Sequence, residues 1–386
     1  MKAINKCFAV VLTAASLLTL GGCAKSTVSV KTATTANWNV RTSVSVEKNM
    51  LEYWQSHAEI AEYDISVKEG GNTYYSVTYN TADATYSTRF YAEASYDWTT
   101  TNVPAEFRVK PDESGKKVTQ EPVYVYETSY KISGVYEVKS SGAVQEFDDE
   151  LTSVCKYRLA GNNLQPVYSK QIVKNTAPNA MGTNNIEQTY IKTDAIFETW
   201  YNQGCTQAIV EHADNLAKDS APTVTKKSIS SKTGYSLFDN SQLRAAVRAF
   251  TMTGGATRTF NVFTPQNMAV QTCTATISSP VELKIADETE KKIIDALNNS
   301  PDDYIFFDGA PSEEGDNKIK NYRYNAVSLA ISADMKGAAP TCWYSCVENA
   351  DLNTTRSVLL KMTTPLSFAL GTMTYTLKSL DVAEIN

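Results

Sequence analysis

Histidine is the side chain that most often moves protons near neutral pH, and this sequence contains only two, His57 and His212. No Gly-x-Ser-x-Gly turn singles out a serine nucleophile, and no His-Glu-x-x-His pair indicates zinc. A phosphate loop and a dinucleotide fingerprint are also missing. We therefore interpret His57 as a partly buried polar residue, and we expect no catalytic residue, metal site or cofactor.

Cys342 and Cys346 enclose the residues Trp343, Tyr344 and Ser345. This spacing differs from the Cys-x-x-Cys of thiol redox proteins. On a strand the two cysteines would share one face with their Cα atoms ~13 Å apart, too far for a disulfide. We interpret them as small apolar residues on the core face, with Trp343 and Ser345 exposed or bridging; a local turn or separate partners would be needed for disulfides.

Acidic residues cluster in the stretch 302–317, where calcium is the ion to consider. Their spacing does not match an EF-hand loop. We interpret the stretch as a solvated loop around a buried strand at 305–307.

Tyrosine is abundant, with 22 residues in the chain. Several aromatic residues follow one another in the segment that reads as strands, and they could line a face that binds sugar or lipid: Trp98, Tyr124, Tyr126, Tyr130 and Tyr136. The alternative is that tyrosine simply suits a half-buried sheet.

The first 25 or so residues have the layout of a bacterial targeting segment. Lys2 and Lys6 precede an uncharged, largely apolar run over 7–20. That run ends in Leu20-Gly21-Gly22-Cys23, which resembles the lipobox of bacterial lipoproteins. The resemblance implies that residues 1–22 are a signal peptide and that Cys23 carries diacylglyceryl and palmitate-type acyl chains. The alternatives are an ordinary secretory signal with a chance cysteine and an uncleaved anchor helix.

A lipid on Cys23 would hold the protein on the extracytoplasmic face of a cell membrane. Ala24 after the cysteine favours the outer membrane in a cell with two membranes, and the outer face of the cell otherwise. Residues 23–37 read as a lipidated tether rich in Ser, Thr, Ala and Lys, and residues 38–386 as the body.

Charge and cysteine counts narrow the class of protein. The chain has 36 Lys+Arg and 42 Asp+Glu, and removing Lys2 and Lys6 leaves 34 against 42, a side-chain charge of −8. With no basic patch, nucleic acid is not an expected partner. Without Cys7 and Cys23 five of the 7 cysteines remain, an odd number that indicates at least one free thiol in a monomer.

The body is mostly strands with short turns. Apolar residues alternate over 63–67, 75–79 and 86–96, with turns at 69–72 and 80–83, which predicts an antiparallel meander. Further strands are expected over 123–138, 151–159, 164–173 and 190–210. A polar stretch at 211–234 is a candidate division of the body.

Two helices stand out in the second half. Asp239-Asn240-Ser241 should cap one with Leu243, Val247 and Phe250 on its apolar face. The second should start at Asp287, Glu288 and Glu290, bury Ile293, Ile294 and Leu297, and stop at 298–301. Strands are expected over 257–263, 268–277, 281–285, 304–307, 322–331, 341–347, 356–362 and 366–380.

These patterns predict a mainly β fold made of antiparallel meanders, either one large curved sheet or two stacked β domains. The first resembles the half-barrel of lipoprotein carriers and related lipid-binding lipoproteins, with two or three helices in its concave face. We expect a non-catalytic surface lipoprotein that binds a hydrophobic or glycan ligand, or a protein partner, in the concavity or on the aromatic face. The alternatives are a hydrolase acting on envelope glycans through two carboxylates, and a structural component of envelope assembly.

Overall fold

The computed structural model describes residues 54–111, 117–160, 163–178, 190–214, 221–230, 235–248, 254–300, 322–331, 339–345, 347–349, 354–366 and 369–385. The predictions for Cys23, the tether, Phe250, the acidic stretch 302–317 and Cys346 concern residues outside these ranges.

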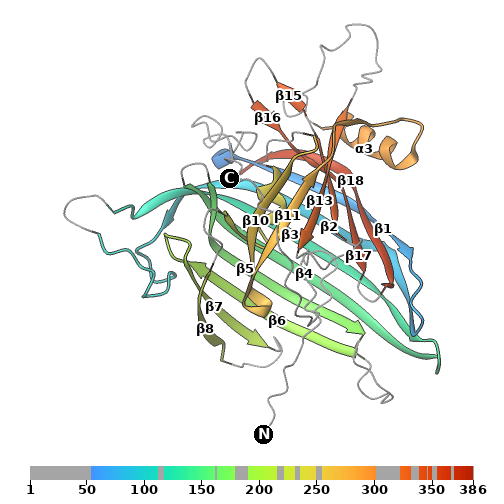
Figure 1. The fold of residues 1–386 in the computed structure, drawn as a ribbon, viewed down its shortest axis with the longest axis horizontal. Helices are drawn as coiled ribbons and strands as arrows, with labels where there is room; N and C mark the ends of the chain where they lie inside the picture. Colours follow the sequence, from blue (N-terminus) through green and yellow to red (C-terminus); the bar gives the residue numbers. More distant parts are fainter. Residues whose placement is uncertain are drawn as a thin grey trace.

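One 16-stranded sheet contains most of the described chain (Figure 1). It confirms the mainly β fold class and the large curved sheet. Its strands lie in the order β8-β7-β6-β5-β4-β3-β2-β1-β18-β17-β14-β13-β11-β10-β9, with β12 beside β13. Their bounds are β1 His57–Glu69, β2 Tyr75–Asp97, β3 Gln120–Val138, β4 Ala143–Ala160, β5 Asn163–Pro178, β6 Tyr190–Tyr201, β7 Gln207–Asp214, β8 Thr223–Ser228, β9 Leu237–Asp239, β10 Thr257–Thr264, β11 Ala269–Ile277, β12 Val281–Glu282, β13 Arg323–Ile331, β14 Thr341–Ser345, β17 Leu359–Leu366 and β18 Gly371–Glu384. A separate pair is β15 Val347–Asn349 with β16 Thr354–Arg356.

The first eight strands form the predicted meander, each antiparallel to the next. Successive side chains of a strand point to opposite faces of the sheet. On β1, Tyr63 and Ile65 are buried on the inner, concave face, while Glu62 and Ser66 are exposed on the outer face. The turn predicted at 80–83 is wrong. β2 continues through it, and the extra residues form a bulge between Asn80 and Thr85 in the pairing with β3.

The two ends of the described chain meet in the middle of the sheet. β1 pairs with β18 from His57 opposite Glu384 to Glu69 opposite Gly371. The sheet therefore has its edges elsewhere, at β8 and β9.

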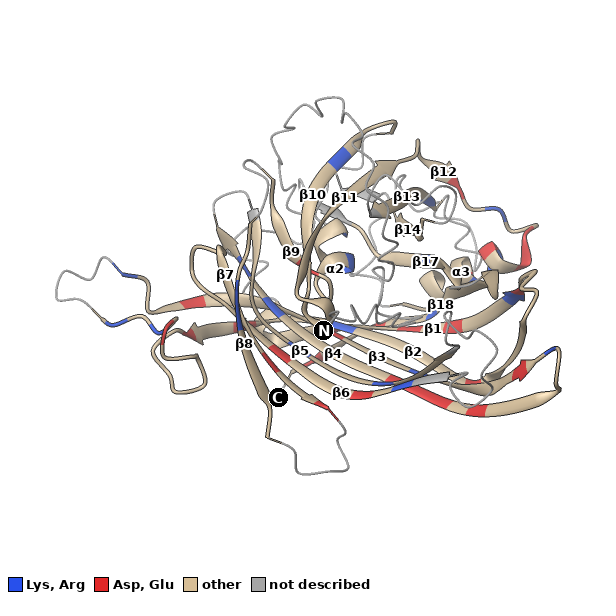
Figure 2. Ribbon diagram, turned by 60° about the horizontal axis from the view of Figure 1, so that its bottom comes forward, with Lys and Arg blue, Asp and Glu red and all other residues tan. Residues whose placement is uncertain are grey.

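The helix α2 (Leu243–Arg248) lies inside the curl of the sheet (Figure 2). The sequence predicted a helix with one apolar face, but all six of its residues are buried. Asp239 ends β9 four residues before the helix, and it accepts a hydrogen bond from the Ser241 amide at 2.8 Å in the turn that leads into α2. Because the whole helix is buried, its two arginines, Arg244 and Arg248, lie in the core. Each buried guanidinium needs polar partners there.

Arg248 makes a two-point ion pair with Glu59 on β1. Both terminal nitrogens of Arg248 donate to the Glu59 carboxylate at 2.7 Å, and its Nε donates to the carbonyl of Ser357. The two side chains are only 6% and 4% exposed. Burial lowers the pKa of Arg248, but the charge of Glu59 and its hydrogen bonds outweigh burial, so the pKa lies above the ordinary value.

Arg244 is surrounded by tyrosines. Its Nη1 donates to the Tyr86 hydroxyl at 2.5 Å, and its guanidinium lies 5.4 Å from the centre of that ring. The Tyr344 hydroxyl of β14 donates to the Arg244 carbonyl at 3.1 Å. The helix therefore joins opposite parts of the curled sheet, β2 and β14.

A segment that we call the strap, residues 98–111, covers part of the outer face. Its Trp98, Val103 and Phe107 pack in a second apolar cluster with side chains of the sheet, Val123, Val167, Trp200 and Ile209.

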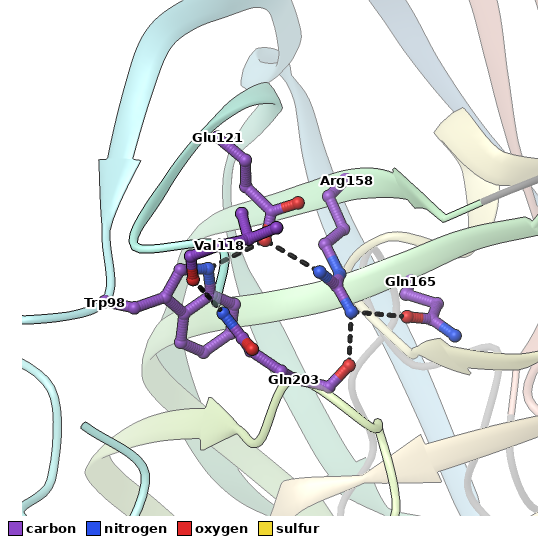
Figure 3. A network of polar contacts seen from close by, with 6 residues as sticks. All are labelled: Trp98, Val118, Glu121, Arg158, Gln165 and Gln203. Carbon is purple, nitrogen blue, oxygen red and sulfur yellow. Dashed lines mark hydrogen bonds and ion pairs between the residues drawn. The ribbon is translucent and has the colours of Figure 1, made fainter. Parts of the chain in front are cut away.

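A polar network fastens the strap (Figure 3). Glu121 accepts from Trp98 Nε1 and from Arg158 Nη1, each at 2.7 Å. Arg158 also donates to Gln165 Oε1 at 3.0 Å and to the Gln203 carbonyl, and Gln203 Nε2 donates to the Val118 carbonyl at 2.7 Å. The strap thus closes an apolar patch that would otherwise lie open on the outer face.

The helix α3 (Glu288–Asn298) begins and ends where the sequence predicts. Asp287 caps it by accepting from the amides of Thr289 and Glu290, and Ile293, Ile294 and Leu297 are buried. The expectation that the helices lie in the concave face is wrong for α3. Lys292 reaches Asp64 at 3.5 Å, and Asp64 points away from the inner face that carries Tyr63.

We predict that Arg248→Met destabilises the protein by about 3–5 kcal/mol, because it leaves the Glu59 carboxylate buried without its counter-charge. Adding Glu59→Gln should restore part of the loss. Urea unfolding of the two single variants and the double variant measures the coupling. A loss of unfolding free energy in the double variant that equals the sum of the two single losses would contradict a coupled pair.

Candidate functional site

The outer face of β18, β1 and β2 carries a cleft of about 770 Å³ beside α3. Its floor is a row of outward side chains on three strands, with Asp64 opposite Thr376 and Glu62 opposite Ser87. The start of α3 is one wall. The bulged part of β2, residues 81–85, is another.

Hydroxyl groups and charges of both signs line this cleft. The lining residues with hydroxyl or charged side chains on the outer face are Glu62, Asp64, Ser66, Thr81, Thr85, Ser87, Glu288, Thr289, Lys292, Thr376 and Lys378. Tyr63, Ile65, Ala82, Ala84 and Tyr86 complete the lining. An ion pair crosses it between Lys292 of α3 and Asp64 of β1, whose side chains are 64% and 45% exposed. Such a lining suits a polar ligand with several hydroxyl or ionic groups better than a hydrocarbon.

The cleft depends on two features that position its walls. Asp287 and Glu290 fix the start of α3, because Asp287 caps the helix and Glu290 Oε2 accepts from the Lys284 amide at 2.7 Å. On the opposite side Asn80 Nδ2 donates to Asp83 at 2.7 Å, which holds the bulge of β2.

The concave side of the sheet, which the sequence suggested as a ligand site, contains packed side chains in the described structure. α2 lies there together with buried rings such as Tyr86, Tyr136, Tyr157 and Tyr375. The Tyr86 and Tyr375 ring centres are 4.9 Å apart.

The aromatic residues that the sequence offered as a possible binding face are buried, so that interpretation is wrong. Tyr124, Tyr126, Tyr130 and Tyr136 belong to the main core at 1–4% exposure. Trp98 is fully buried where the strap packs against the outer face of the sheet. Tyrosine serves here as a core residue, which was the alternative interpretation.

The two histidines lie on different strands of the sheet. His57 starts β1, is half-buried, and lies 2.9 Å from the Ser56 hydroxyl, as expected for a partly buried polar residue. His212 on β7 stacks on Phe197 at 4.4 Å and contacts Asp214 at 2.8 Å. Five strands, β2 to β6, separate them in the sheet order.

Four cysteines of the described chain are free and buried: Cys155, Cys205, Cys273 and Cys342. Cys342 lies on the core face of β14 as predicted, while Ser345 is buried and Trp343 stacks on Tyr324. Burial raises the pKa of the Cys342 thiol to about 11 and that of Cys205 to about 12. Thiols of this kind are poor nucleophiles.

Among the residues that the structure describes, no group of three or more His, Cys, Asp or Glu side chains is arranged to hold a metal ion. Within the same ranges, no helix combines the length and the apolar character needed to cross a bilayer.

A buried acid lies at one end of the inner face, on β4. Asp149 accepts from the Thr176 amide at 2.8 Å and from Asn175 Nδ2 at 2.9 Å. Burial raises its pKa to about 7, and the hydrogen bond from Thr176 opposes that shift only in part. Sequence inspection did not identify this residue, because an acid within an alternating strand reads as a solvated side chain.

Comparison with known proteins gives little further guidance. No protein-family model matches the chain. No curated protein sequence matches it either. Among solved structures, the chain is similar to a beta-barrel-like protein of a domain of unknown function, DUF1849, from Brucella abortus, with 8% identity, a TM-score of 0.39, and coverage of 85% of this chain and 98% of that one. So loose a likeness carries no functional argument.

We predict that Asp149 makes stability depend on pH. Its folded pKa of about 7 lies above the ordinary 3.8, so its stabilising contribution is complete below pH 3.8 and is lost as the pH rises to about 7. The loss is at most ~4 kcal/mol. The unfolding free energy of the wild type should therefore fall relative to that of Asp149→Asn across this range.

Urea unfolding at a series of pH values measures that difference. Glu146→Gln is the matched control, because Glu146 lies on the same strand with an exposed side chain, and its removal should give a nearly flat difference. A flat difference for Asp149→Asn would contradict the prediction.

Proposed function

We propose that this protein is a lipid-anchored lipoprotein of the extracytoplasmic face that binds a polar, glycan-like ligand in the cleft beside α3. The cleft supports this choice of a polar ligand, because it has a volume of about 770 Å³ and is lined by hydroxyls, carboxylates and ammonium groups. Its volume lies within the range of small-molecule sites.

The cleft chemistry matches a sugar better than a lipid. Sugar hydroxyls both donate and accept, and carboxylates such as Asp64 and Glu62 accept while threonine hydroxyls do either. The ammonium groups of Lys292 and Lys378 add a preference for sugars with acidic substituents. A hydrophobic ligand in the concavity is disfavoured, because α2 and buried rings occupy that space.

The anchor is proposed from the sequence. It is supported by three sequence features in the order that lipoprotein precursors have: the positively charged N-terminal residues, the uncharged run over 7–20, and Leu20-Gly21-Gly22-Cys23. A tether of about a dozen residues reaches ~20 Å if flexible. The cleft would then work close to the membrane surface.

A hydrolase is the second candidate, because Glu62 and Asp64 line the same cleft and alternate along β1. Residues two apart on a strand point to the same side with Cα atoms about 7 Å apart, which allows their carboxyl groups to come within the separation of about 5 to 10 Å that glycosidases use. Binding is favoured over hydrolysis, because a general acid needs an apolar or buried setting. Glu62 is exposed, and the Asp64 side chain is 45% exposed.

We predict that Cys23 accepts the lipid. Cells given an alkyne analogue of palmitate should incorporate it into the wild type and into Cys7→Ser, whose changed residue leaves with the signal peptide. Cys23→Ser should carry no label and should remain as precursor with residues 1–22. Label retained by Cys23→Ser would refute the anchor.

We predict that the cleft binds acidic oligosaccharides. Isothermal titration with a panel of uronic-acid, amino-sugar and neutral oligosaccharides should give the strongest binding for the acidic members. Lys378→Ala should weaken that binding about tenfold, the effect of one charge-assisted hydrogen bond.

The matched control is Lys174→Ala, which removes a 51%-exposed lysine on β5 outside the cleft. It should bind as the wild type does. Release of reducing ends during the titration would favour the hydrolase, and binding unaffected by Lys378→Ala would place the ligand elsewhere.

A further inference from the structure

The two edge strands of the sheet differ in exposure. The edge strand β9 is covered, because Leu237, Phe238 and Asp239 are all buried. The Asp239 carboxylate accepts from Ser169 Oγ at 2.7 Å and from the Tyr201 hydroxyl at 2.5 Å. This edge therefore lies against the inner face of β5 and β6.

The other edge, β8, is open. All six of its residues, Thr223–Ser228, are exposed, and Val224 is 59% exposed. Within the described chain it pairs only with β7, from Gln207 opposite Ser228 to His212 opposite Thr223. A terminal strand directs alternate N–H and C=O groups away from its sheet, so β8 can accept another strand.

Apart from Lys226 and Lys227, which discourage an uncharged or basic strand, the sequence of β8 is suited to pairing. It contains threonine and valine, which favour extended backbone, and it has no proline that would remove a donor. It has no acidic residue, although the chain as a whole carries an excess of acids.

The two lysines of β8 lie on opposite faces of the ribbon. Lys227 pairs with Ala208, an inner-face residue with no exposure. Lys226 is on the outer face, with its Nζ 5.6 Å from the Phe107 ring centre of the strap. A strand added to β8 would therefore meet an ammonium group on each of its faces.

We propose that β8 is a docking edge for an extended, acidic peptide segment of a partner protein. Backbone hydrogen bonds to β8 would supply affinity, and carboxylates placed opposite Lys226 and Lys227 would supply the preference for an acidic strand. A second copy of this chain fits less well, because two β8 strands would bring four lysines into one ribbon.

The probe is a synthetic peptide of about ten residues that combines valine and threonine with glutamates, compared with the same peptide carrying lysines. The protein is the purified full chain in detergent. Hydrogen exchange should show that the acidic peptide protects backbone amides of residues 223–228, and that the basic peptide does not.

Affinity measured by fluorescence anisotropy should follow the charge. The double variant Lys226→Glu with Lys227→Glu should bind the acidic peptide about tenfold more weakly and should gain affinity for the basic one. The control makes the same charge change at the exposed Lys68 and Lys291, which lie on β1 and α3, and it should bind as the wild type does.

Three results would overturn the proposal. The first is that residues 223–228 exchange at the same rate with and without the acidic peptide. The second is that both peptides bind equally. The third is sedimentation of the free protein as a dimer in which β8 is already protected. The exchange measurement on the wild type decides the matter if the double variant fails to fold. Oligosaccharide binding in the cleft is measured separately, so either proposal can fail alone.

Discussion

The pairing of Arg248 with Glu59 is the interaction on which the curled sheet depends. A sheet of this length encloses a volume that must be filled, and α2 fills it with a helix that carries two arginines. Burying a guanidinium is tolerable only with a counter-charge and hydrogen-bond acceptors in place. Glu59 on β1 supplies both, so the helix sits in one position along the strands rather than sliding among equivalent apolar contacts.

Because the concave side is filled, the binding surfaces that we propose both lie elsewhere. With α2 and the tyrosine rings packed inside, features that can meet other molecules lie on the outer face and at the open edge. The strap covers one part of that face, α3 covers another, and the cleft lies between α3 and the bulged strand β2. The described structure is an open, curved sheet whose concave side is filled by α2 and buried aromatic side chains.

The sequence predicted strands and α3 well, because strict alternation and an Asp-capped apolar stripe are local signals. It failed where distant residues decide the outcome. The polar residues at 80–83 indicate a turn in the sequence, but they form a bulge because β3 pairs with β2 on both sides of them. Tyr124 and Tyr126 read as an exposed face, since a pattern does not reveal what covers it. The cleft was invisible because its walls come from segments more than 200 residues apart.

The hydrogen bond from the Ile385 amide to the Ser56 carbonyl, 2.8 Å long, places the end of the described chain beside its beginning. Together with the pairing of β1 and β18, it makes the body nearly circular in its connectivity. Joining these ends with a short linker and opening the exposed turn between β3 and β4 would keep every strand pair. Such a permuted chain would carry its free termini at the exposed turn between β3 and β4, and we expect it to keep the fold.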